Sequence, residues 1–187
     1  MMQLNKLNCR IQRTPVFLFH ADISKCFDCI DHDALLRKIG VQPIFYKQIR
    51  GWLKSGILDN FELREVERGT PQGGVISPLL ANITLHGMEE VVNQYILGAP
   101  LRNKRGIAIG SREKVRSISL IRYGDDFVIL HESKFVVEIC GDLIKDHLAL
   151  MGLILKPEKR RVAHTLSPEL SEPSIAGFDF LGFHIQQ

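Results

Sequence analysis

An aspartate interrupts the apolar run Val16–Ile23, which follows Pro15 and has the length and composition of a buried strand. The aspartate is Asp22, near the end of that run. Because a carboxylate buried without a partner is costly, Asp22 needs an arginine, backbone donors or a cation. The chain must therefore fold so that another segment brings such a group to the end of this strand.

A second acidic feature lies farther along the chain. The apolar runs Ile118–Tyr123 and Phe127–Leu130 predict two strands, and Gly124-Asp125-Asp126 between them fits a tight hairpin turn. Gly-Asp is common in turns for backbone reasons alone, whereas two adjacent anions also form a ligand set for a divalent metal ion. If the Asp22 strand lies beside this hairpin, three carboxylates converge at one sheet edge, as a two-metal site for phosphoryl transfer requires. Spacing alone leaves both interpretations open.

Helices and strands alternate along the rest of the chain. The pattern predicts helices over 31–39, 43–54, 77–98 and 135–151, and strands near 61–67, 160–164 and 177–185. The third helix is expected to begin with Ser77 as N-cap and Pro78 at the first helical position. The basic stretch that ends at Arg116 is expected to be a loop or hairpin. This order favours an α+β fold, with a ferredoxin-like antiparallel sheet and helices packed on one face.

Composition narrows the class of protein. The 187 residues are 45% hydrophobic and 24% charged, which is ordinary globular usage and sets the expectation of one domain. No run of about 18 apolar residues occurs and no secretory signal is readable, so we expect neither a membrane span nor a membrane partner. Four cysteines are too few for a disulfide scaffold, which favours the cytoplasm of a bacterial cell or an organelle matrix. The single C-x-x-C of Cys26 and Cys29 lacks the second ligand pair of a zinc site.

Basic residues are unevenly distributed although the net charge is only +3. Two clusters are consistent either with solvated loops or with a track for a phosphate backbone. They consist of Arg102, Lys104, Arg105, Arg112, Lys114, Arg116 and Arg122, and of Lys156, Lys159, Arg160 and Arg161.

Five segments together resemble the palm motifs of reverse transcriptases, most of all those encoded by group II introns. The first is Phe19-His20-Ala21-Asp22-Ile23-Ser24-Lys25-Cys26-Phe27-Asp28, continued by Ile30-Asp31-His32 and Leu35-Leu36. The others are Gly69–Asn82, Arg122–Phe127, Gly152-Leu153 with Lys156 and Lys159, and Phe178–Phe183. They occur in the family's order and cover most of the chain from Phe19 to Ile185.

The resemblance implies a polymerase palm that adds dNTPs to a DNA or RNA primer on an RNA template. Asp22, Asp125 and Asp126, with the backbone carbonyl of Ile23, would hold two Mg²⁺ ions, for which Mn²⁺ can substitute. Lys159 is the implied proton donor to the pyrophosphate leaving group, and Lys156 is the alternative.

The resemblance also assigns residues to the nucleotide and the primer. Phe27 matches the aromatic that crowds the sugar 2′ position and excludes ribonucleotides, although a phenylalanine after a strand is also ordinary core. Gln72 would lie near the nascent base pair, Gly73 would let the backbone approach a nucleotide closely, and Tyr123 would contact the substrate. Phe180-Leu181-Gly182 would form the turn that grips the primer end.

The sequence departs from the family pattern. Gly124 stands where group II intron enzymes usually carry alanine, and glycine there is more typical of RNA-templated RNA polymerases. Those enzymes place a carboxylate where Phe27 stands, and Asp28 is one residue too late, so deoxynucleotide selection is favoured. We expect residues 1–187 to be a single reverse transcriptase palm domain without fingers, thumb, maturase-specific or endonuclease regions. The isolated chain should then show weak activity or none, and a partner chain that supplies fingers and thumb is an expected partner.

Two alternative functions are also consistent with the sequence. The same surface binds intron RNA in such proteins, so the chain could be a catalytically inactive, RNA-binding maturase-like fragment. A nucleotide cyclase shares the palm architecture, but the segment 70–73 counts against it.

Overall fold

The structure is a computed structural model of the 187-residue chain. It describes residues 16–40, 43–54, 57–59, 62–64, 68–70, 75–103, 105–171, 178–181 and 183–185. The chain divides into two compact units. The first comprises Met1–Asp22, Glu89–Ile144 and Leu155–Gln187, and the second comprises Ile23–Met88 and Lys145–Ile154. Helices mixed with antiparallel strands confirm the predicted α+β class.

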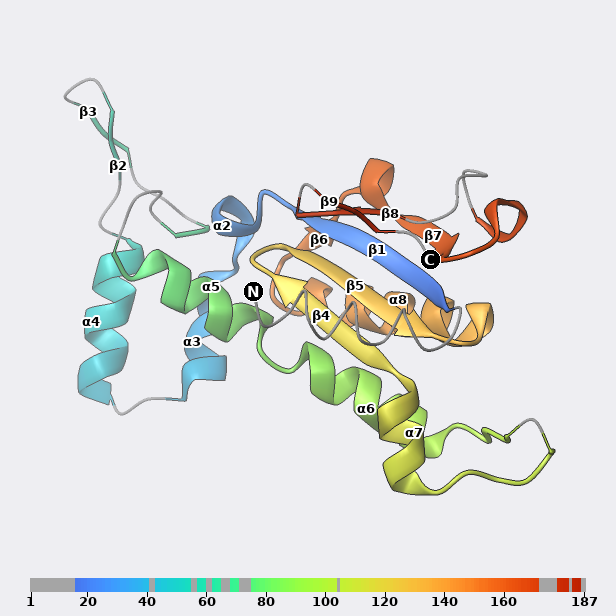
Figure 1. The fold of residues 1–187 in the computed structure, drawn as a ribbon. Coiled ribbons are helices and arrows are strands. Elements are labelled where there is room, and N and C mark those ends of the chain that lie inside the picture. The colour runs from blue at the N-terminus through green and yellow to red at the C-terminus, as the bar shows by residue number, and fades with distance from the viewer. Residues whose placement is uncertain are drawn as a thin grey trace. The chain divides into compact units, whose positions relative to one another are not determined.

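Strand β1 (Phe17–Ser24) lies in the middle of the main sheet, whose order is β4-β5-β1-β6 with β7 also paired to β1. β4 (Ser119–Tyr123) and β5 (Asp126–His131) form an antiparallel hairpin, and β5 and β7 (Arg161–His164) both run antiparallel to β1. β6 (Ile154–Leu155) completes the sheet. Figure 1 shows β4, β5 and β1 side by side. The strands predicted from the three apolar runs are thereby confirmed.

The two faces of β1 have different coverings, since successive side chains of a strand point to opposite faces. Leu18 is fully buried in a cluster on one face, together with Phe180 of β8 (Phe178–Phe180), which pairs with β9 (Phe183–Ile185). Phe19 is fully buried on the other face. There it meets α8 (Lys134–Ala149), where Gly141 lets its ring approach the helix backbone.

The second unit contains α2 (Cys26–Cys29), α3 (His32–Ile39), α4 (Pro43–Leu53), α5 (Ser77–Leu85) and the β2 (Ile57–Asp59)–β3 (Glu62–Arg64) hairpin. The caps of α3 are those the sequence predicts. The Asp31 side chain accepts a hydrogen bond from Ala34 N at 2.7 Å, and Gly40 ends the helix with φ 60°.

The helix predicted over 77–98 is in fact two helices, α5 and α6 (Met88–Gly98). The break falls at Gly87, whose φ of 98° is left-handed and therefore incompatible with helix continuation. The predicted Ser77 N-cap is also wrong, because Ile76 is the cap residue and the helix begins at Ser77 without a side-chain cap. Pro78 is accordingly in the second helical position.

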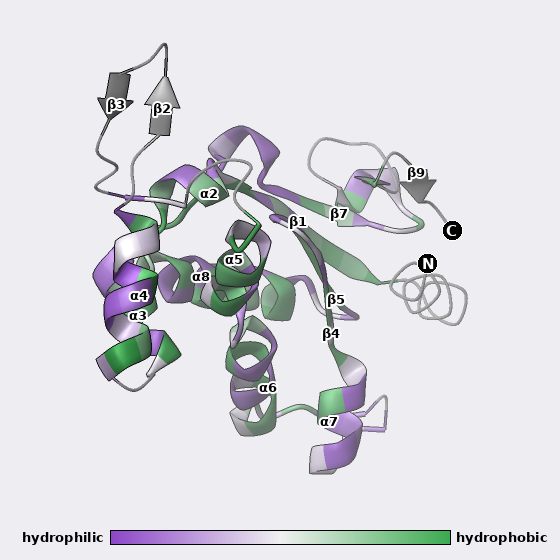
Figure 2. Cartoon of the chain, turned by 90° about the vertical axis from the view of Figure 1, so that its left-hand side faces the viewer, coloured by the Kyte–Doolittle hydropathy of each residue, from purple (hydrophilic) through white to green (hydrophobic). Residues whose placement is uncertain are grey.

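The basic stretch before Arg116 is only partly the loop or hairpin that we expected. A bridge joins Arg102 and Ala108, but Ser111–Ser117 form helix α7. Arginine, glutamate and lysine form helices well, and none of the α7 residues is buried, so no apolar period reveals the helix in the sequence. Figure 2 shows its largely hydrophilic colouring. Lys114 Nζ donates to the carbonyls of Leu97 and Ala99 at 2.9 and 2.5 Å and so caps the end of α6.

Cys26, Cys29 and Cys140 are free thiols. Burial raises the pKa of the Cys140 thiol to about 12, so this cysteine is an apolar core residue in practice. Within the residues that the structure describes, no helix has both the length and the apolar character needed to cross a membrane.

We predict that Gly141→Ala destabilises the protein. The added Cβ would lie 2.5 Å from Phe19 Cε2, and the buried ring has no open side to move to. The free energy of unfolding in urea should fall by about 1–3 kcal/mol. Gly51→Ala is the control, because this exposed helical glycine has nothing within 4 Å and its replacement should add up to about 1 kcal/mol. Equal stability of the two variants would contradict the packing described here.

Candidate active site

Asp22 is held by two lysines at the end of β1. Its side chain is 7% exposed, and its Oδ2 accepts hydrogen bonds from Lys156 Nζ at 3.0 Å and Lys159 Nζ at 2.5 Å. The backbone assists, since Lys156 N donates to the Asp22 carbonyl at 2.8 Å. The partner that the sequence requires for this carboxylate is therefore a pair of ammonium groups.

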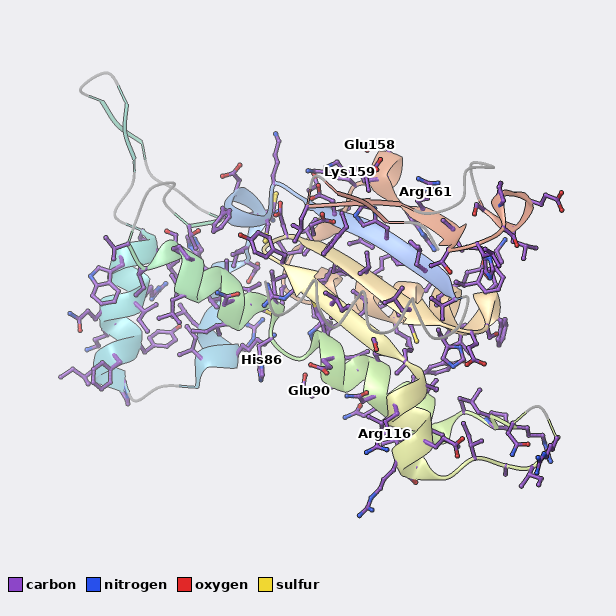
Figure 3. All side chains as sticks on the ribbon, viewed as in Figure 1. His86, Glu90, Arg116, Glu158, Lys159 and Arg161 are labelled. Atoms are coloured by element: carbon purple, nitrogen blue, oxygen red, sulfur yellow. The ribbon has the colours of Figure 1, made fainter. Side chains whose placement is uncertain are left out.

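A short 3₁₀ helix, η1 (Pro157–Lys159), explains why both lysines reach the same oxygen. Lys156 is its N-cap and Lys159 its last residue. Side chains three residues apart eclipse each other in a 3₁₀ helix, so both stems leave on one side. Figure 3 shows Lys159 on η1.

The electrostatics of this cluster extend beyond the hydrogen bonds. Burial on its own would raise the pKa of Asp22, but the hydrogen bonds and charges of Lys159 and Lys156 outweigh it and hold the pKa below the usual 3.8. The hydrogen bond to Asp22 raises the pKa of Lys159, and the charges of Asp126 and Asp125 raise it further, against a smaller opposing effect of burial. Lys159 therefore interacts with all three predicted aspartates.

Asp125 and Asp126 lie at the turn between β4 and β5. The pairing of Tyr123 with Asp126 leaves Gly124 and Asp125 as the two turn residues. Only Gly124 has a positive φ there, 63°, as in a type II′ hairpin turn. Arg122 Nη1 donates to the Gly124 carbonyl at 2.8 Å and supports the turn. The glycine that departs from the family pattern thus has a backbone reason.

The sheet register brings Asp126 opposite Asp22. They are direct Cα partners across β5 and β1, so their side chains share one face with Cβ atoms about 4.5–5.5 Å apart. Their carboxylates have different partners, however. Asp22 faces the lysines, whereas Asp126 Oδ1 lies 2.6 Å from His20 Nε2.

One feature of the aspartates fits a divalent cation, and another differs from a preformed metal site. Asp22 Oδ1 is buried and has no hydrogen-bond partner, which leaves a carboxylate oxygen of the kind that hard cations bind. No three His, Cys, Asp or Glu side chains in the described part of the chain are gathered as a metal-ligand cluster. The lysines thus supply the positive charge at Asp22 in this structure.

Phe27 and the start of the second motif lie in the other unit. Phe27 is 39% exposed, so it is not the core residue that its position would otherwise suggest. Thr70 N donates to the Phe27 carbonyl at 2.6 Å. Gly69 is required beside it, because a Cβ there would meet the Phe27 and Asp28 carbonyls at 2.6 Å. Gln72 and Gly73 lie outside the described residues.

The predicted primer-grip turn joins β8 and β9. Phe180 is 1% exposed and belongs to the core cluster, against which Leu181 is packed. Leu181 has φ 54°, a left-handed conformation that costs a non-glycine residue roughly 1–2 kcal/mol. Gly182 lies outside the described residues. Tyr123 is 63% exposed at the end of β4.

The two basic clusters have different environments. In the second, Lys156 and Lys159 bind Asp22, and Arg160 bonds Asp142 at 2.7 Å while its guanidinium lies 5.4 Å from the Phe19 ring centroid. That cluster is therefore mostly paired within the fold. In the first, α7 presents exposed basic side chains, of which Arg116 extends outward in Figure 3. A phosphate-backbone track there stays a prediction.

The sequence analysis missed one residue at this site, His20. Its place two residues before Asp22 puts both on the same face of β1, and that period-2 relation is the signal that could have found it. Its partner Asp126 is 106 positions away, so only the β1–β5 register identifies the contact.

The mixed helices and antiparallel sheet have the α+β architecture of a polymerase palm, and comparison with known proteins identifies the family. The reverse transcriptase (RNA-dependent DNA polymerase) family model matches residues 2–185. The chain belongs to this family. Its relatives place it with the proteins encoded by group II introns, and reverse transcriptases generally use divalent metal ions.

Three curated relatives illustrate the similarity. The group II intron-encoded protein LtrA of Lactococcus lactis subsp. cremoris is 45% identical over 76 residues, which are 39% of this chain and 13% of LtrA. An uncharacterized 91 kDa protein in the cob intron of Schizosaccharomyces pombe is 35% identical, covering 80% of this chain and 24% of that protein. Protein YkfC of Escherichia coli is 26% identical, over 90% of this chain and 46% of YkfC. The chain thus spans less than half the length of these relatives.

Solved structures show the same fold at low sequence identity. Telomerase from Candida tropicalis, solved with a TWJ fragment of telomeric RNA, superimposes with a TM-score of 0.67 at 13% identity, over 99% of this chain and 31% of the telomerase chain. Apo telomerase from the same organism gives a TM-score of 0.65 at 14% identity, over 99% and 33%. These neighbours support the palm architecture.

We predict that Asp22→Asn weakens the protein at neutral pH and flattens its acid denaturation. A lowered native pKa gives stability that is present above the unfolded pKa, about 3.8, and is lost as the pH falls through the native pKa. The difference in unfolding free energy between wild type and variant should therefore be largest above about pH 4 and shrink below it. Urea titrations without divalent ions over a pH series test this. Asp142→Asn, which breaks an exposed pair, should change little at any pH, and a pH-independent effect of Asp22→Asn would contradict the assignment.

Proposed function

We propose that this chain is the palm of an RNA-directed DNA polymerase of group II intron type, which adds dNTPs to a DNA or RNA primer on an RNA template. The proposal rests on the cluster at the end of β1. There Lys159 forms a salt bridge with Asp22, and the charges of Asp125 and Asp126 raise the pKa of Lys159. Nucleotidyl transfer depends on positioning and charge neutralisation, and such a cluster supplies both signs of charge at one place. We propose that residues 1–187 form one such palm domain.

Asp22, Asp125 and Asp126, with the Ile23 carbonyl, are the groups that would hold two Mg²⁺ ions, with Mn²⁺ as a substitute. Such ions lower the pKa of an attacking hydroxyl and stabilise the leaving oxygen. The buried, unpartnered Asp22 Oδ1 and the alignment of Asp22 with Asp126 across the sheet support this ligand set.

Lys159 is the proposed proton donor to the pyrophosphate leaving group. Its side chain is 53% exposed, so the flexible stem can turn the ammonium from Asp22 to a triphosphate. The hydrogen bond to Asp22 raises the pKa of Lys159, so Nζ is protonated while it waits at the carboxylate and carries a proton that it can donate. Lys156 is 28% exposed and remains the alternative donor or a phosphate ligand.

The other assignments concern the nucleotide and the primer. Exposure of the Phe27 ring supports its role at the sugar 2′ position, and Tyr123 is accessible to a substrate. Gln72 and Gly73 keep their assignment to the nascent base pair. The left-handed Leu181 supports a primer-grip role for 180–182, because strained backbone concentrates at functional sites.

The proposed partners follow from the reaction: an RNA template, a primer, dNTPs, intron RNA and a chain or segment that supplies fingers and thumb. The free thiols suit a reducing compartment, and we place the protein in a bacterial cytoplasm or an organelle matrix.

We predict that Asp125→Ala/Asp126→Ala abolishes primer extension. The assay uses the chain, an RNA template, a DNA primer, dNTPs and Mg²⁺ at low salt. Loss of two carboxylates should reduce extension at least about 100-fold, because metal-held charge stabilisation contributes several kcal/mol. Asp142→Ala/Asp146→Ala removes the same charge from exposed positions on α8 and should extend as wild type does. Measurable extension that is equal in wild type and Asp125→Ala/Asp126→Ala would refute the polymerase proposal.

We further predict that Phe27→Val relaxes sugar selection. Removing steric bulk beside a 2′-hydroxyl changes discrimination by about 10–200-fold, as other size-based exclusions do. The ratio of rNTP to dNTP incorporation should rise by that order while dNTP incorporation persists. Phe45→Val, which truncates an exposed phenylalanine of α4, is the matched control. An unchanged ratio in Phe27→Val would remove Phe27 from the site.

A second candidate function is RNA binding by a maturase-like fragment without catalysis. It is favoured by the pairing of Asp22 with two lysines, which compensates the carboxylate without a metal ion. Intron RNA that binds wild type and Asp125→Ala/Asp126→Ala equally, together with no extension by either protein, would select this candidate.

A further inference from the structure

His20 connects two parts of the proposed site. Its Nε2 lies 2.6 Å from Asp126 Oδ1, and its side chain is 16% exposed where that of Asp126 is 27% exposed. In the sheet it stands between Val128 of β5 and Arg161 of β7, and it shares a face with Asp22. The contact therefore joins the side chains of β1 and β5, and β7 pairs with β1 on the other side of His20.

The chemistry of the contact fixes its direction. An ionised carboxylate can only accept hydrogen bonds, so His20 Nε2 carries the hydrogen and donates it to Asp126 Oδ1. Hydrogen bonds to a charged acceptor are roughly twice as strong as neutral ones. The bond fixes one oxygen of Asp126 and leaves Oδ2 outside this contact.

The His20 ring is itself held in place. It meets Phe180 edge-on, with ring centroids 6.1 Å apart and an interplanar angle of 82°. This is a favourable aromatic arrangement, and Phe180 is 1% exposed in the core cluster. The imidazole therefore cannot turn away from Asp126 without disturbing buried packing.

We propose that His20 is a positioning residue that orients the Asp126 carboxylate for a divalent cation and ties it to the β8–β9 hairpin through Phe180. The inference rests on the proposed function, in which Asp126 is a metal ligand. His20 touches neither substrate nor metal in this role. It acts as the outer partners of metal-bound carboxylates do, whose loss commonly costs 10–100-fold in metal affinity.

Binding of Mn²⁺ alone, followed by electron paramagnetic resonance and calorimetry on the full chain, tests the proposal. His20→Phe keeps a ring but removes the donor, and it should weaken Mn²⁺ binding about tenfold or more. His20→Gln restores an N–H at a similar position and should recover most of the affinity. Recovery by a donor is not expected if His20 matters only for packing.

His131→Phe is the matched control in the same sheet. His131 is 5% exposed and bonds Ser133 N at 3.0 Å, and it lies five residues along β5 from Asp126, roughly 17 Å away. Its replacement should lower the thermal midpoint of unfolding without changing Mn²⁺ affinity.

The outcomes separate this inference from the function on which it rests. If Asp22→Asn and Asp125→Ala/Asp126→Ala bind Mn²⁺ as wild type does, the proposed metal site itself fails. If the aspartate variants lose Mn²⁺ while His20→Phe binds normally, the role of His20 is overturned and the proposed function stands.

A measurement on the wild type covers the case in which His20→Phe does not fold. Nitrogen-15 spectra of the imidazoles should show His20 protonated at Nε2, with a shift that changes in Asp126→Ala. A His20 protonated only at Nδ1 would overturn the inference.

Discussion

Burial of the Asp22 carboxylate at the end of β1 is the constraint on which the site depends. A carboxylate that is 7% exposed must be compensated, and the chain compensates it with Lys156 and Lys159 from a 3₁₀ turn. That requirement fixes where η1 lies against β1. Pairing of Asp22 with Asp126 across the sheet then places the β4–β5 turn at the same edge. The residues of the site therefore come from three separate parts of the chain.

The division of β1 into two faces explains how a polar cluster coexists with a stable core. Phe19, at an odd position, packs against α8, where Gly141 permits close approach. On the face formed by the even positions, Leu18 is apolar and lies in the core, whereas His20 and Asp22 are polar and belong to the site. Core and site thus lie within five residues of each other on this face. Phe180 closes the apolar part and contacts His20 at the boundary. The site thus rests on rigid strands, as precise positioning of charges requires.

Local signals predicted much of this fold, and long-range contacts account for what they missed. The apolar runs predicted β1, β4 and β5, and Asp31 and Gly40 predicted the ends of α3. Helix α7 was missed because it buries nothing, and the break at Gly87 because an isolated glycine is tolerated within a helical pattern. Burial predicted that Asp22 needs a partner, namely an arginine, backbone donors or a cation, but which residues supply it depends on contacts with lysines 134 and 137 residues away. The resemblance to reverse transcriptases identified Lys159 as a residue of the site. The physical argument from burial identified only that Asp22 needs a partner.

The charges of this cluster nearly balance within the protein. Asp22, Asp125 and Asp126 carry three negative charges and Lys156 and Lys159 carry two positive ones, so these five side chains together have a net charge of −1. Self-repulsion of the aspartates is therefore largely relieved within the protein. The same compensation means that a cation approaching Asp22 competes with two ammonium groups for Oδ2, whereas the buried Oδ1 has no hydrogen bond that a cation would have to displace. Under the proposed function, lysines displaced from the carboxylate would lie beside the anionic groups of a nucleotide.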